Sequence, residues 1–403
     1  MTSKLEDLIA KLCPNGVEYK VLGELCNICT GKLNANAKDE DGIYPFFTCD
    51  ANPYKINEYA FDTSAILISG NGSQVGHLNQ YEGKFNAYQR TYVLDNFKLV
   101  IKPFLFHFMD AYLKPYIMVN CKKGSVPYIT LPMLQSFNVP VPPLEVQREI
   151  VRILDSFTLL TAELTAELTA ELTARSKQYE YYRDALLTFD DNNPLHSLIS
   201  RYCPNGVEYK KIGDIASVDR GGNLQKKDFC EHGIPCIHYG QIYTKYGLFA
   251  SKSYTFIDSE CASKQRFAHK NDIVMAVTSE NIEDVCKCVA WFGEENAAVS
   301  GHSAIIRHNQ NAKYLVYYFH SSMFFLQKKK LAHGTKVIEV TPSDLLDVKI
   351  PVPPLEVQHQ IVKILDRFDA LCNDLTQGLP AEIEARRKQY EYYRDQLLTF
   401  KRA

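Results

Sequence analysis

Leucine recurs at every fourth position in the middle of the chain, at Leu160, Leu164, Leu168 and Leu172. The residues between these leucines are threonine, alanine and glutamate, because Thr161–Leu172 is three copies of the tetrapeptide TAEL. Alanine, leucine and glutamate favour helix, and four residues turn a helix by ~400° and advance it by ~6 Å. The pattern therefore predicts a helix whose apolar stripe rotates by ~40° per repeat. The repeats are either a spacer whose length matters or a slipped tandem copy on a solvated helix.

The predicted helix is far longer than its repeats, since no proline or glycine occurs between Pro143 and Thr188. Pro143 suits the first helical position, where the missing N–H costs nothing. Glu145 then lies in the first turn, where the positive end of the helix dipole favours a carboxylate. At about 1.5 Å per residue the helix would be roughly 70 Å long, whereas an average globular helix has only ~11–12 residues. A rod of this length needs a partner helix.

The chain itself supplies a candidate partner, because almost the whole helix occurs twice. Val139–Leu160 (VPVPPLEVQREIVRILDSFTLL) corresponds to Ile350–Leu371 (IPVPPLEVQHQIVKILDRFDAL), and Lys177–Phe189 (KQYEYYRDALLTF) corresponds to Lys388–Phe400 (KQYEYYRDQLLTF). Both pairs are 211 residues apart, so the two copies have the same length. The second copy keeps the apolar spacing at Leu375, Leu379 and Ile383. It also contains Gly378 and Pro380, which predict a kink or a break.

A second duplication precedes each helix. Leu5–Lys20 (LEDLIAKLCPNGVEYK) returns as Leu195–Lys210 (LHSLISRYCPNGVEYK), 190 residues later. The chain is therefore a cap, a variable region and a long helix, followed by the same three segments again, with a second variable region that is 21 residues longer. Two large repeats do not make a solenoid, which needs several short units. They predict a pseudo-twofold molecule.

The two variable regions contain the short β-branched and aromatic runs that are typical of strands, separated by Gly and Asn turns. Strands are predicted at Ala65–Ser69, Thr91–Leu94, Ile234–Tyr239, Asp272–Val277 and Ser303–Arg307. Each region also has an apolar-aromatic segment that favours a helix, Pro103–Leu113 in the first and Ala312–Leu326 in the second. The predicted fold class is α/β (α+β), with two mixed domains separated by two long antiparallel helices in a pseudo-twofold internal duplication.

Composition indicates a well-cored globular protein. The 403 residues are 46% hydrophobic and 12% aromatic, with no apolar run of membrane-spanning length and no N-terminal signal peptide, so a cytoplasmic location is expected. The 12 cysteines would then stay reduced. Cys26 and Cys29 form a close pair, as do Cys286 and Cys288, but neither pair has a second one at zinc-finger spacing. Ordinary thiols are therefore favoured, and no metal site is predicted.

Charge does not by itself indicate a nucleic-acid partner. The net charge of the chain is −2, residues 21–138 are neutral overall, and residues 211–349 carry +2. Any affinity for DNA must therefore come from local basic loops, or be shared with a partner subunit.

The duplicated layout, the PVPPLEVQ helix starts and the TAEL repeats together resemble the specificity subunit of type I restriction–modification systems. The variable regions resemble the target recognition domains of that family in seven segments: TGK at Thr30–Lys32, YPFFT at Tyr44–Thr48, ILISGNGSQVG at Ile66–Gly76, GKFNAYQRTYVL at Gly83–Leu94, GGNLQKKDF at Gly221–Phe229, GIPCIHYGQI at Gly233–Ile242 and GHSAIIR at Gly301–Arg307. The resemblance covers essentially the whole chain. It implies target recognition domains at residues 1–141 and 191–352, a central conserved helix at 142–190 and a distal conserved helix at 353–403.

The resemblance also implies a function. Members of this family are non-catalytic subunits of a type I restriction enzyme or adenine-specific DNA methyltransferase complex. Each recognition domain reads one half of a bipartite double-stranded DNA target, two methyltransferase subunits dock on the helices, and motor-nuclease subunits join them. S-adenosylmethionine, ATP and Mg²⁺ are then expected in the partner subunits, and no cofactor is expected in this chain. A methylation-only system without a nuclease partner is an alternative that the sequence leaves open.

A stand-alone DNA methyltransferase is a further alternative, which two segments could suggest. Asn52–Tyr54 (NPY) has one proline fewer than the NPPY amino-methylation motif. Gly70–Ser73 (GNGS) resembles a cofactor-binding glycine loop, but no acidic strand end follows at the distance that the ribose requires. The loop Gly70–Gly76 is better interpreted as a turn that lets the backbone approach a ligand closely, and in this family that ligand would be a DNA groove.

Polar and basic side chains on such loops are the predicted DNA contacts. Lysines would neutralise phosphates, while Asn, Gln and Arg can read base edges through two hydrogen bonds. The alternative for any one of them is a solvated surface side chain. The predicted set is Asn71, Ser73, Gln74, Gln89, Arg90, Lys122, Lys123 and Ser125 in the first domain, and Arg220, Asn223, Lys226, Lys227, Thr278, Ser279, His302, Thr335 and Lys336 in the second. Lys122–Ser125 and Gly334–Lys336 stand out, because each directly precedes the segment that returns to a long helix.

The repeated segment YEYYRD carries three tyrosines within four positions. These are Tyr179, Tyr181 and Tyr182 in the first copy and Tyr390, Tyr392 and Tyr393 in the second. Neighbouring residues of a helix point ~100° apart, so one face cannot bury all three. We therefore predict partner contacts here, with one tyrosine packed in the helix pair and another facing a second protein. A tyrosine-rich but merely amphipathic helix end is the alternative.

Overall fold

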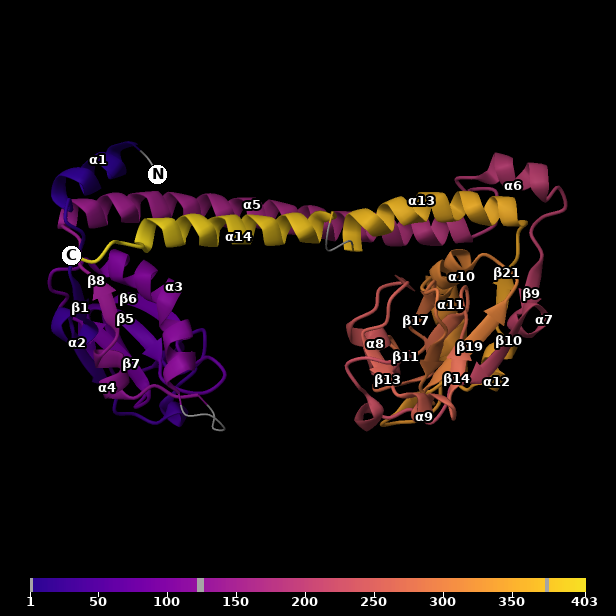
Figure 1. Cartoon of the computed structure of the whole chain (residues 1–403), viewed down its shortest axis with the longest axis horizontal. Coiled ribbons are helices and arrows are strands. Elements are labelled where there is room, and N and C mark those ends of the chain that lie inside the picture. Colours follow the sequence, from indigo (N-terminus) through magenta and orange to yellow (C-terminus); the bar gives the residue numbers. More distant parts are fainter. Residues whose placement is uncertain (1–2, 122–126, 374–376) are drawn as a thin grey trace. The chain divides into compact units, whose positions relative to one another are not determined.

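A computed structural model of the chain describes residues 3–121, 127–373 and 377–403, whose course Figure 1 follows by colour. The chain forms two compact units. Unit 1 is Met1–Glu167 together with Glu384–Ala403, and unit 2 is Leu168–Ile383. No helix among the described residues is long and apolar enough to cross a membrane. Each unit combines strands with helices, so the predicted mixed α/β class is confirmed.

Unit 1 is built on a six-stranded sheet. Its strand order is β2 (Asn27–Thr30), β7 (Thr91–Asp95), β5 (Phe61–Ser69), β6 (Leu78–Ala87), β3 (Tyr44–Phe47) and β4 (Tyr54–Ile56). Neighbouring strands are antiparallel, except for the parallel pair β3 and β6. The predicted strands Ala65–Ser69 and Thr91–Leu94 lie inside β5 and β7 and are confirmed. Because β5 ends at Ser69, the glycine loop that begins at Gly70 lies at the end of a central strand.

The core of unit 1 lies between this sheet and α3 (Lys102–Asn120). The predicted helix Pro103–Leu113 is confirmed, although α3 continues past Pro115 for five further residues. Buried side chains recur every four residues along α3, at Leu105, Met109, Leu113 and Ile117, and they share one core with Ile66, Ile68 and Leu94 of the sheet. The remaining elements of unit 1 are α1 (Ser3–Leu12), β1 (Tyr19–Val21), α2 (Leu22–Leu25), η1 (Ala35–Ala37), α4 (Leu131–Gln135) and β8 (Asn138–Pro140).

The cap of unit 1 joins segments from both ends of the chain. Strand β1 pairs antiparallel with β8, which leads into the first long helix. Directly before β1, the Val17 N–H donates to the Lys401 carbonyl (2.8 Å), and the Val17 carbonyl accepts from the Ala403 N–H (3.1 Å). Gly16 permits this approach, because its φ is +103° and a Cβ there would lie 2.7 Å from the Lys401 carbonyl oxygen. Unit 1 is therefore assembled from residues that are far apart in the sequence.

Unit 2 contains two larger sheets. The five-stranded sheet has the order β10 (Ala216–Arg220), β19 (Ser303–His308), β15 (Ile273–Ala276), β17 (Cys288–Trp291) and β12 (Phe249–Ala250). The four-stranded sheet has the order β13 (Thr255–Ile257), β11 (Ile234–Ile237), β18 (Ala297–Val299) and β14 (Arg266–Ala268). Two short ladders pair β16 (Thr278–Ser279) with β20 (Ile338–Glu339), and β9 (Tyr209–Lys211) with β21 (Lys349–Pro351). The helices are α6 (His196–Tyr202), α7 (Ile212–Ile215), η2 (Lys226–Asp228), α8 (Tyr239–Thr244), α9 (Ser259–Ala262), α10 (Ala312–Phe319), α11 (Ser322–Leu331) and α12 (Pro342–Leu346).

Two predicted elements of unit 2 need correction. The strand predicted at Ile234–Tyr239 ends at Ile237, because the His238 ring accepts a hydrogen bond from the Gly240 N–H (3.2 Å) and caps α8. The helix predicted at Ala312–Leu326 is two helices, because the Ser321 hydroxyl accepts from the Phe324 N–H (3.3 Å) and starts α11. The other predicted strands, Asp272–Val277 and Ser303–Arg307, are confirmed as β15 and β19.

The first long helix, α5 (Leu144–Leu187), is continuous over 44 residues, as predicted. The second copy is interrupted: α13 (Leu355–Asn373) ends before Gly378, and α14 (Leu379–Leu398) begins directly after it. Pro380 then occupies the first turn of α14, where proline is tolerated. The predicted position Leu375 lies outside the described residues.

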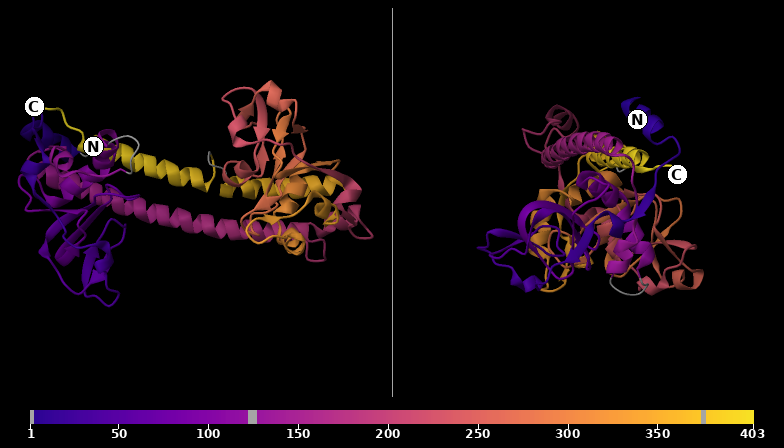
Figure 2. Two further views of the ribbon diagram at one scale, coloured as in Figure 1. Left: turned by 90° about the horizontal axis from the view of Figure 1, so that it is seen from below. Right: turned by 90° about the vertical axis from the view of Figure 1, so that its left-hand side faces the viewer.

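The long helices pack antiparallel in each unit (Figures 1 and 2). In unit 1, α5 packs against α14, with the rings of Phe157 and Tyr393 5.9 Å apart and the hydroxyls of Thr158 and Tyr390 at 3.0 Å. In unit 2, α5 packs against α13, where Tyr182 stacks on Phe368 at 5.4 Å. The duplicated helix sequence therefore supplies its own partner.

The glutamine of the repeated PPLEVQ motif fastens the start of α5 to the body of unit 1. Gln147 is fully buried, and its Nε2 donates to the carbonyls of Pro142 (2.7 Å) and Leu99 (2.8 Å). Its Oε1 accepts from the Ile101 N–H (2.9 Å), directly before α3. One side chain thus joins the beginnings of α5 and α3.

Unit 2 repeats this arrangement with Gln358. Its Nε2 donates to the Pro353 carbonyl (2.8 Å) and to Gln310 Oε1 (2.8 Å), and its Oε1 accepts from the Asn311 N–H (3.0 Å). Gln358 is also fully buried, and Asn311 caps α10. The repeated motif therefore holds the same tertiary junction in both units.

Candidate nucleic-acid interface

Two loops of unit 1 that are distant in sequence meet at the end of the central strands. The Gly70 N–H donates to the Arg90 carbonyl (2.9 Å), and the Gly70 carbonyl accepts from the Ile129 N–H (2.8 Å). A Cβ at Gly70 would lie only 2.2 Å from the Arg90 carbonyl oxygen, so only glycine allows this approach. The glycine loop therefore lies against the turn that carries Gln89 and Arg90.

The predicted DNA contacts of the first domain that the structure describes all lie on this pair of loops. Ser73, Gln74, Gln89 and Arg90 are exposed, and Asn71 is half-buried. We call this group, Asn71 to Gln74 with Gln89 and Arg90, the unit 1 edge. Lys122, Lys123 and Ser125 lie outside the described residues.

The unit 1 edge also includes residues that sequence reasoning missed. Gln89 Nε2 donates to Asn34 Oδ1 (3.0 Å), which brings the segment after β2 to the edge. The turn between β3 and β4 approaches it as well, because Cys49 Sγ contacts the Arg90 carbonyl (3.5 Å) and His77 Nε2 contacts the Ala51 carbonyl (3.2 Å). These residues come from separate hairpins, so no local sequence signal connects them.

In unit 2, the short β16–β20 ladder gathers several predicted residues. Thr278 is paired with Glu339, and Ser279 with Ile338. The Thr278 hydroxyl lies 3.1 Å from His302 Nδ1, and the Arg220 guanidinium forms an ion pair with the Glu339 carboxylate. We call this group, Arg220, Thr278, Ser279, His302 and Glu339, the unit 2 edge. Thr278 is only 6% exposed and its hydroxyl faces His302, and its predicted contact with DNA stays a prediction.

The predicted residues Thr335 and Lys336 lie on the turn that leads into the same ladder. Both are exposed, and His333 exchanges two backbone hydrogen bonds with Glu339 (2.8 and 3.0 Å) across the turn. Gly334 has a φ of +104°, and a Cβ there would lie 2.0 Å from the Val337 carbonyl oxygen. A left-handed glycine therefore fixes the turn that carries Lys336.

Asn223, Lys226 and Lys227 form a neighbouring basic group on and before η2. All three are exposed, and Asn223 and Lys227 line an open cavity of about 460 Å³ with Asp258 and Lys264, among others. A row of aromatic rings connects this region to the unit 2 edge. The ring centroids are 5.7 Å apart for Phe229 and His238, 4.6 Å for His238 and Tyr239, and 4.9 Å for Tyr239 and His302.

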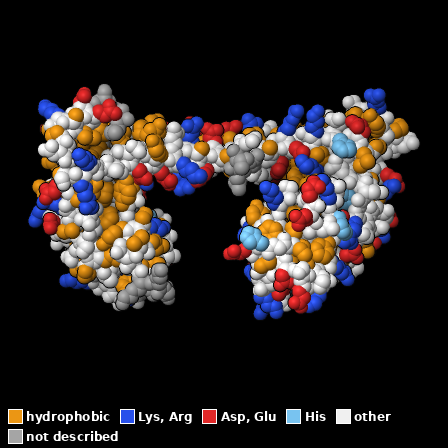
Figure 3. Space-filling view, viewed as in Figure 1, with side chains coloured by type: hydrophobic (Ala, Val, Ile, Leu, Met, Phe, Trp, Pro, Cys, Tyr) orange, Lys and Arg blue, Asp and Glu red, His pale blue; other side chains and the backbone are white. Residues whose placement is uncertain are grey.

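His238 lies between Phe229 and Tyr239 in this row. Burial lowers its pKa, and the charges of Lys226 and His302 lower it further. The sequence prediction did not include His238, Tyr239 or Glu339, which neighbour predicted residues only through the fold. Figure 3 shows acidic and basic side chains interspersed over the face it presents, in agreement with the near-zero net charge.

The tyrosines of YEYYRD divide into packed and exposed positions in unit 2. Tyr179 is buried, and burial raises its pKa, while Tyr182 stacks on Phe368. Tyr181 is 68% exposed. Tyr179 and Tyr182 therefore stabilise the helix pair, and Tyr181 is the member of this group that is free to meet a second protein.

The second copy, in unit 1, has two exposed tyrosines instead of one. Tyr390 is half-buried beside Thr158, while the ring of Tyr393 lies tilted near Phe157 and is 44% exposed. Tyr392 is 61% exposed. Partner binding by Tyr181 and Tyr392 stays a prediction.

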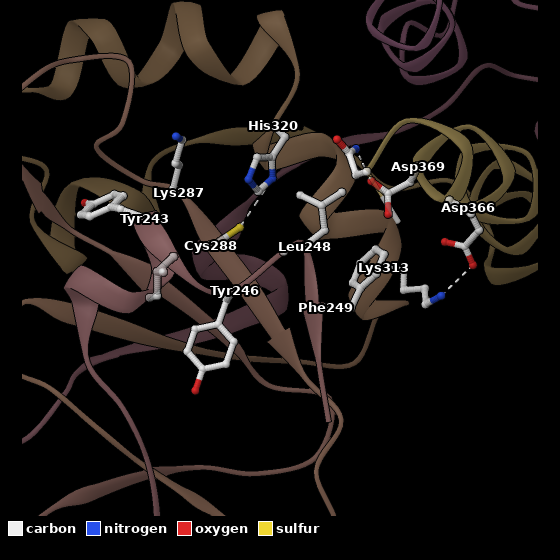
Figure 4. A pocket seen from close by; sticks show the side chains of 14 residues that line it. Tyr243, Tyr246, Leu248, Phe249, Lys287, Cys288, Lys313, His320, Asp366 and Asp369 are labelled. Atoms are coloured by element: carbon white, nitrogen blue, oxygen red, sulfur yellow. Dashed lines mark hydrogen bonds and ion pairs between the residues drawn. The ribbon is translucent and has the colours of Figure 1, made fainter. Parts of the chain in front are cut away.

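A separate cavity of about 590 Å³ in unit 2 contains cysteine, histidine, lysine and aspartate side chains (Figure 4). Cys288 Sγ lies 4.0 Å from His320 Nδ1, and Lys313 forms an ion pair with Asp366 (2.6 Å). Burial raises the pKa of Cys288 well above its ordinary value and lowers the pKa of His320 to about 4. A neutral thiol beside a neutral imidazole is not an activated nucleophile. Among the described residues, no group of three His, Cys, Asp or Glu side chains could hold a metal ion.

Comparison with known proteins identifies one family. The family model described as Type I restriction modification DNA specificity domain matches residues 14–174 and 204–385. The putative type I restriction enzyme specificity subunit S.HindORF215P of Haemophilus influenzae is 32% identical over 400 residues, which cover 95% of this chain and 96% of that protein. The type I restriction enzyme EcoR124I/EcoR124II specificity subunit of Escherichia coli is 35% identical over 269 residues, covering 65% of this chain and 61% of that protein.

A solved structure has the same fold. That structure describes complex assembly and conformational transition of the type I R-M system. One of its chains superposes on this chain with a TM-score of 0.66 and is 17% identical in sequence. The superposition covers 96% of this chain and 98% of that chain.

Proposed function

This chain belongs to the type I restriction modification DNA specificity family, and on that premise we propose that each of its two units reads one half of a divided DNA target. DNA target recognition is the role of the family, whose members are generally non-catalytic. One half-site per unit is the finer step that we propose. The observation that carries it is that each unit gathers polar loops from distant parts of the sequence at one edge.

The chemistry of the two edges suits DNA. Exposed Gln89 and Arg90 of the unit 1 edge can reach base edges, where amide and guanidinium groups form paired hydrogen bonds. Exposed Lys226, Lys227 and Lys336 beside the unit 2 edge can neutralise phosphates, which fixes a protein on the duplex without reading sequence.

Exchange of one variable region tests the division into half-sites. Residues 21–138 would be replaced by the corresponding region of another family member, and the methylated adenines of the host genome would be sequenced. We expect one half of the methylated sequence to change and the other half to stay. A change in both halves together would contradict one half-site per unit.

We further propose that α5 sets the spacing between the half-sites through its TAEL repeats. Along Thr161–Leu172 the alanines and glutamates are exposed, while the leucines are half-buried. The second copy of the helix has no matching repeat, so removal of one unit shifts the register of the helix pair and should lower its stability. Removal of one TAEL unit shortens the helix by ~6 Å and rotates the remainder of the helix by ~40°. One base pair turns DNA by about 34–36° and advances it by about 3.4 Å, so the rotation matches one base pair and the translation lies nearer two.

The two-unit variant should therefore recognise the same half-sites with a spacer one base pair shorter. Rotation decides, because a recognition unit on the wrong side of the duplex makes no base contacts, whereas modest DNA bending absorbs a mismatch of ~2–3 Å. Methylation sequencing reads the spacer directly. An unchanged spacer would show that the repeats do not set the distance.

We also propose that the outward tyrosines Tyr181 and Tyr392 contribute to docking of two methyltransferase subunits, which motor-nuclease subunits then join. In this arrangement S-adenosylmethionine, ATP and Mg²⁺ belong to the partner subunits, and the isolated chain neither methylates nor cuts DNA. Tyr181→Ala and Tyr392→Ala should weaken assembly in size-exclusion runs more than Gln89→Ala does. Equal assembly of all three variants would count against these docking positions.

A further inference from the structure

The unit 2 edge contains one cation and one anion that face each other, Arg220 and Glu339. Their side chains are 44% and 32% exposed, so the pair is accessible from solvent. This inference rests on the proposed function, because it takes the unit 2 edge as a DNA-reading surface.

Both members of the pair are held on rigid backbone. Arg220 is the last residue of β10, where it is paired with Ala304 of β19, and its carbonyl accepts from Arg266 Nη1 (2.8 Å). Glu339 lies in β20, where it is paired with Thr278 on one side and His333 on the other. Strand pairing therefore places the backbone of both residues, and the ion pair joins their charged groups, an arrangement that suits direct reading of bases.

A carboxylate is a poor group for a surface that meets phosphates. Glu339 repels phosphate oxygens, and it cancels the charge that Arg220 would offer to them. The paired charges add little to sequence-independent affinity, which depends on unpaired Lys and Arg. A carboxylate can bind DNA favourably where it accepts from an exocyclic amino group in the major groove, such as cytosine N4.

The order of groups on a G·C base pair matches the Arg220–Glu339 pair. Across the major groove, guanine presents two acceptors, N7 and O6, and cytosine then presents the N4 donor. A guanidinium can donate to the two acceptors while an adjoining carboxylate accepts from the donor. An A·T pair presents an acceptor, a donor and an acceptor, so one arm of the guanidinium would face the adenine amino group.

We propose that Arg220 and Glu339 together determine specificity for one G·C base pair in the half-site that unit 2 reads. Arg220 donates to guanine N7 and O6, and Glu339 accepts from cytosine N4. The ion pair between them orients both groups before DNA binds. Because the two charges cancel, the pair contributes to the choice of base and little to the binding of phosphates.

Two conservative substitutions test the proposal. Arg220→Lys keeps the positive charge but loses the planar pair of donors, and Glu339→Gln keeps the size and an acceptor but adds a donor that tolerates other bases. The matched control is Asp347→Asn, which removes an exposed ion pair of the same unit with Lys211 (2.7 Å) outside the edge. Each full-length variant would be assembled with the methyltransferase subunits of its system and given a library of double-stranded DNA randomised in the second half-site.

Sequencing of the methylated DNA gives the preference at every position. We expect both variants to lower the preference for the same single G·C pair by roughly 10- to 100-fold. Every other position, the first half-site and the Asp347→Asn control should keep their wild-type preferences.

Three results would overturn the proposal. Wild-type preferences in both variants would show that the pair reads no base. A uniform loss at all positions, with a lower unfolding midpoint, would show that the pair only fastens β20 to β10. Relaxation of two different positions would contradict joint reading. A wild-type complex with no preferred target would instead contradict the proposed function itself.

Discussion

Removal of the Gln358 side chain should destabilise unit 2 selectively. Gln358→Ala deletes three hydrogen bonds of 2.8–3.0 Å from a fully buried site. Each such bond contributes about 1 kcal/mol, and the Asn311 N–H and Pro353 carbonyl would be left without their side-chain partner. We therefore expect a loss of roughly 3 kcal/mol in the free energy of unfolding of unit 2.

The single tryptophan of the chain makes this loss measurable for unit 2 alone. Trp291 is 1% exposed in the core of unit 2, so its fluorescence follows the unfolding of that unit. In urea, with a slope of ~2–3 kcal/mol per M, the fluorescence midpoint of Gln358→Ala should fall by about 1 M. The matched control is Gln147→Ala, which deletes the equivalent three hydrogen bonds from unit 1 and should leave the tryptophan midpoint unchanged.

Two outcomes would refute this reasoning. An unchanged midpoint in Gln358→Ala would mean that the repeated glutamine adds no net stability at its junction. Equal shifts in both variants would mean that the two units unfold as one body, despite their separate cores. Hydrogen exchange followed by mass spectrometry should show that the backbone amides of unit 1 exchange faster in Gln147→Ala than in the wild type.

Other perturbations test further parts of the structure. Hydrogen bonds from Arg152, and to a smaller extent from Lys4, lower the pKa of Glu149 to about 2. This carboxylate therefore stabilises the folded state fully above pH 4.5, and the stabilisation is lost as the pH falls toward 2. Because Arg152 and Lys4 are both largely exposed, this stabilisation amounts to only about 1 kcal/mol. Glu149→Gln should remove the corresponding pH dependence of stability, measured by urea titrations followed by circular dichroism. The buried ammonium of Lys328 donates to the carbonyls of Glu283 (2.9 Å) and Val285 (2.6 Å). Lys328→Met should therefore lower the Trp291 fluorescence midpoint by an amount equivalent to roughly 2–3 kcal/mol. The control Lys329→Met changes an exposed lysine and should leave that midpoint unchanged. Gly70→Ala should weaken recognition of the unit 1 half-site in methylation assays, because its Cβ would displace the turn at Arg90, while Gly247→Ala, with open space around it, should have no effect.

Local sequence signals predicted the elements whose boundaries depend on local chemistry. The length of α5 follows from the absence of helix breakers, and the break in its copy follows from Gly378 and Pro380. The break between α10 and α11 was missed, because Ser321 lies within an apolar-aromatic run and its hydroxyl acts as a cap only in the folded chain. The strand β11 was predicted two residues too long for a similar reason. The ring of His238 caps helix α8, and a histidine is not an ordinary capping residue.

The candidate site was predictable only in part. Glycine-rich loops indicated where the backbone is closely approached, and Gly70 and Gly334 fit that reading. The neighbours of these loops could not be predicted, because Asn34 reaches Gln89 and Glu339 reaches Arg220 only through strand register and tertiary packing. The sequence also could not predict which polar side chains are buried. The polar residues around Thr278 give no sign that its hydroxyl faces His302 inside the fold.

The pairing of Val17 with Lys401 and Ala403 has a consequence for the synthesis of the chain. All residues of unit 2 leave the ribosome before residue 384, so unit 2 can complete its core during translation. Unit 1 holds residues that are made before unit 2, yet its core includes Leu397 and Leu398, which are made after unit 2. Unit 1 therefore finishes folding after unit 2, and the apolar surface of its earlier part stays uncovered, and open to chaperones, while unit 2 is being made.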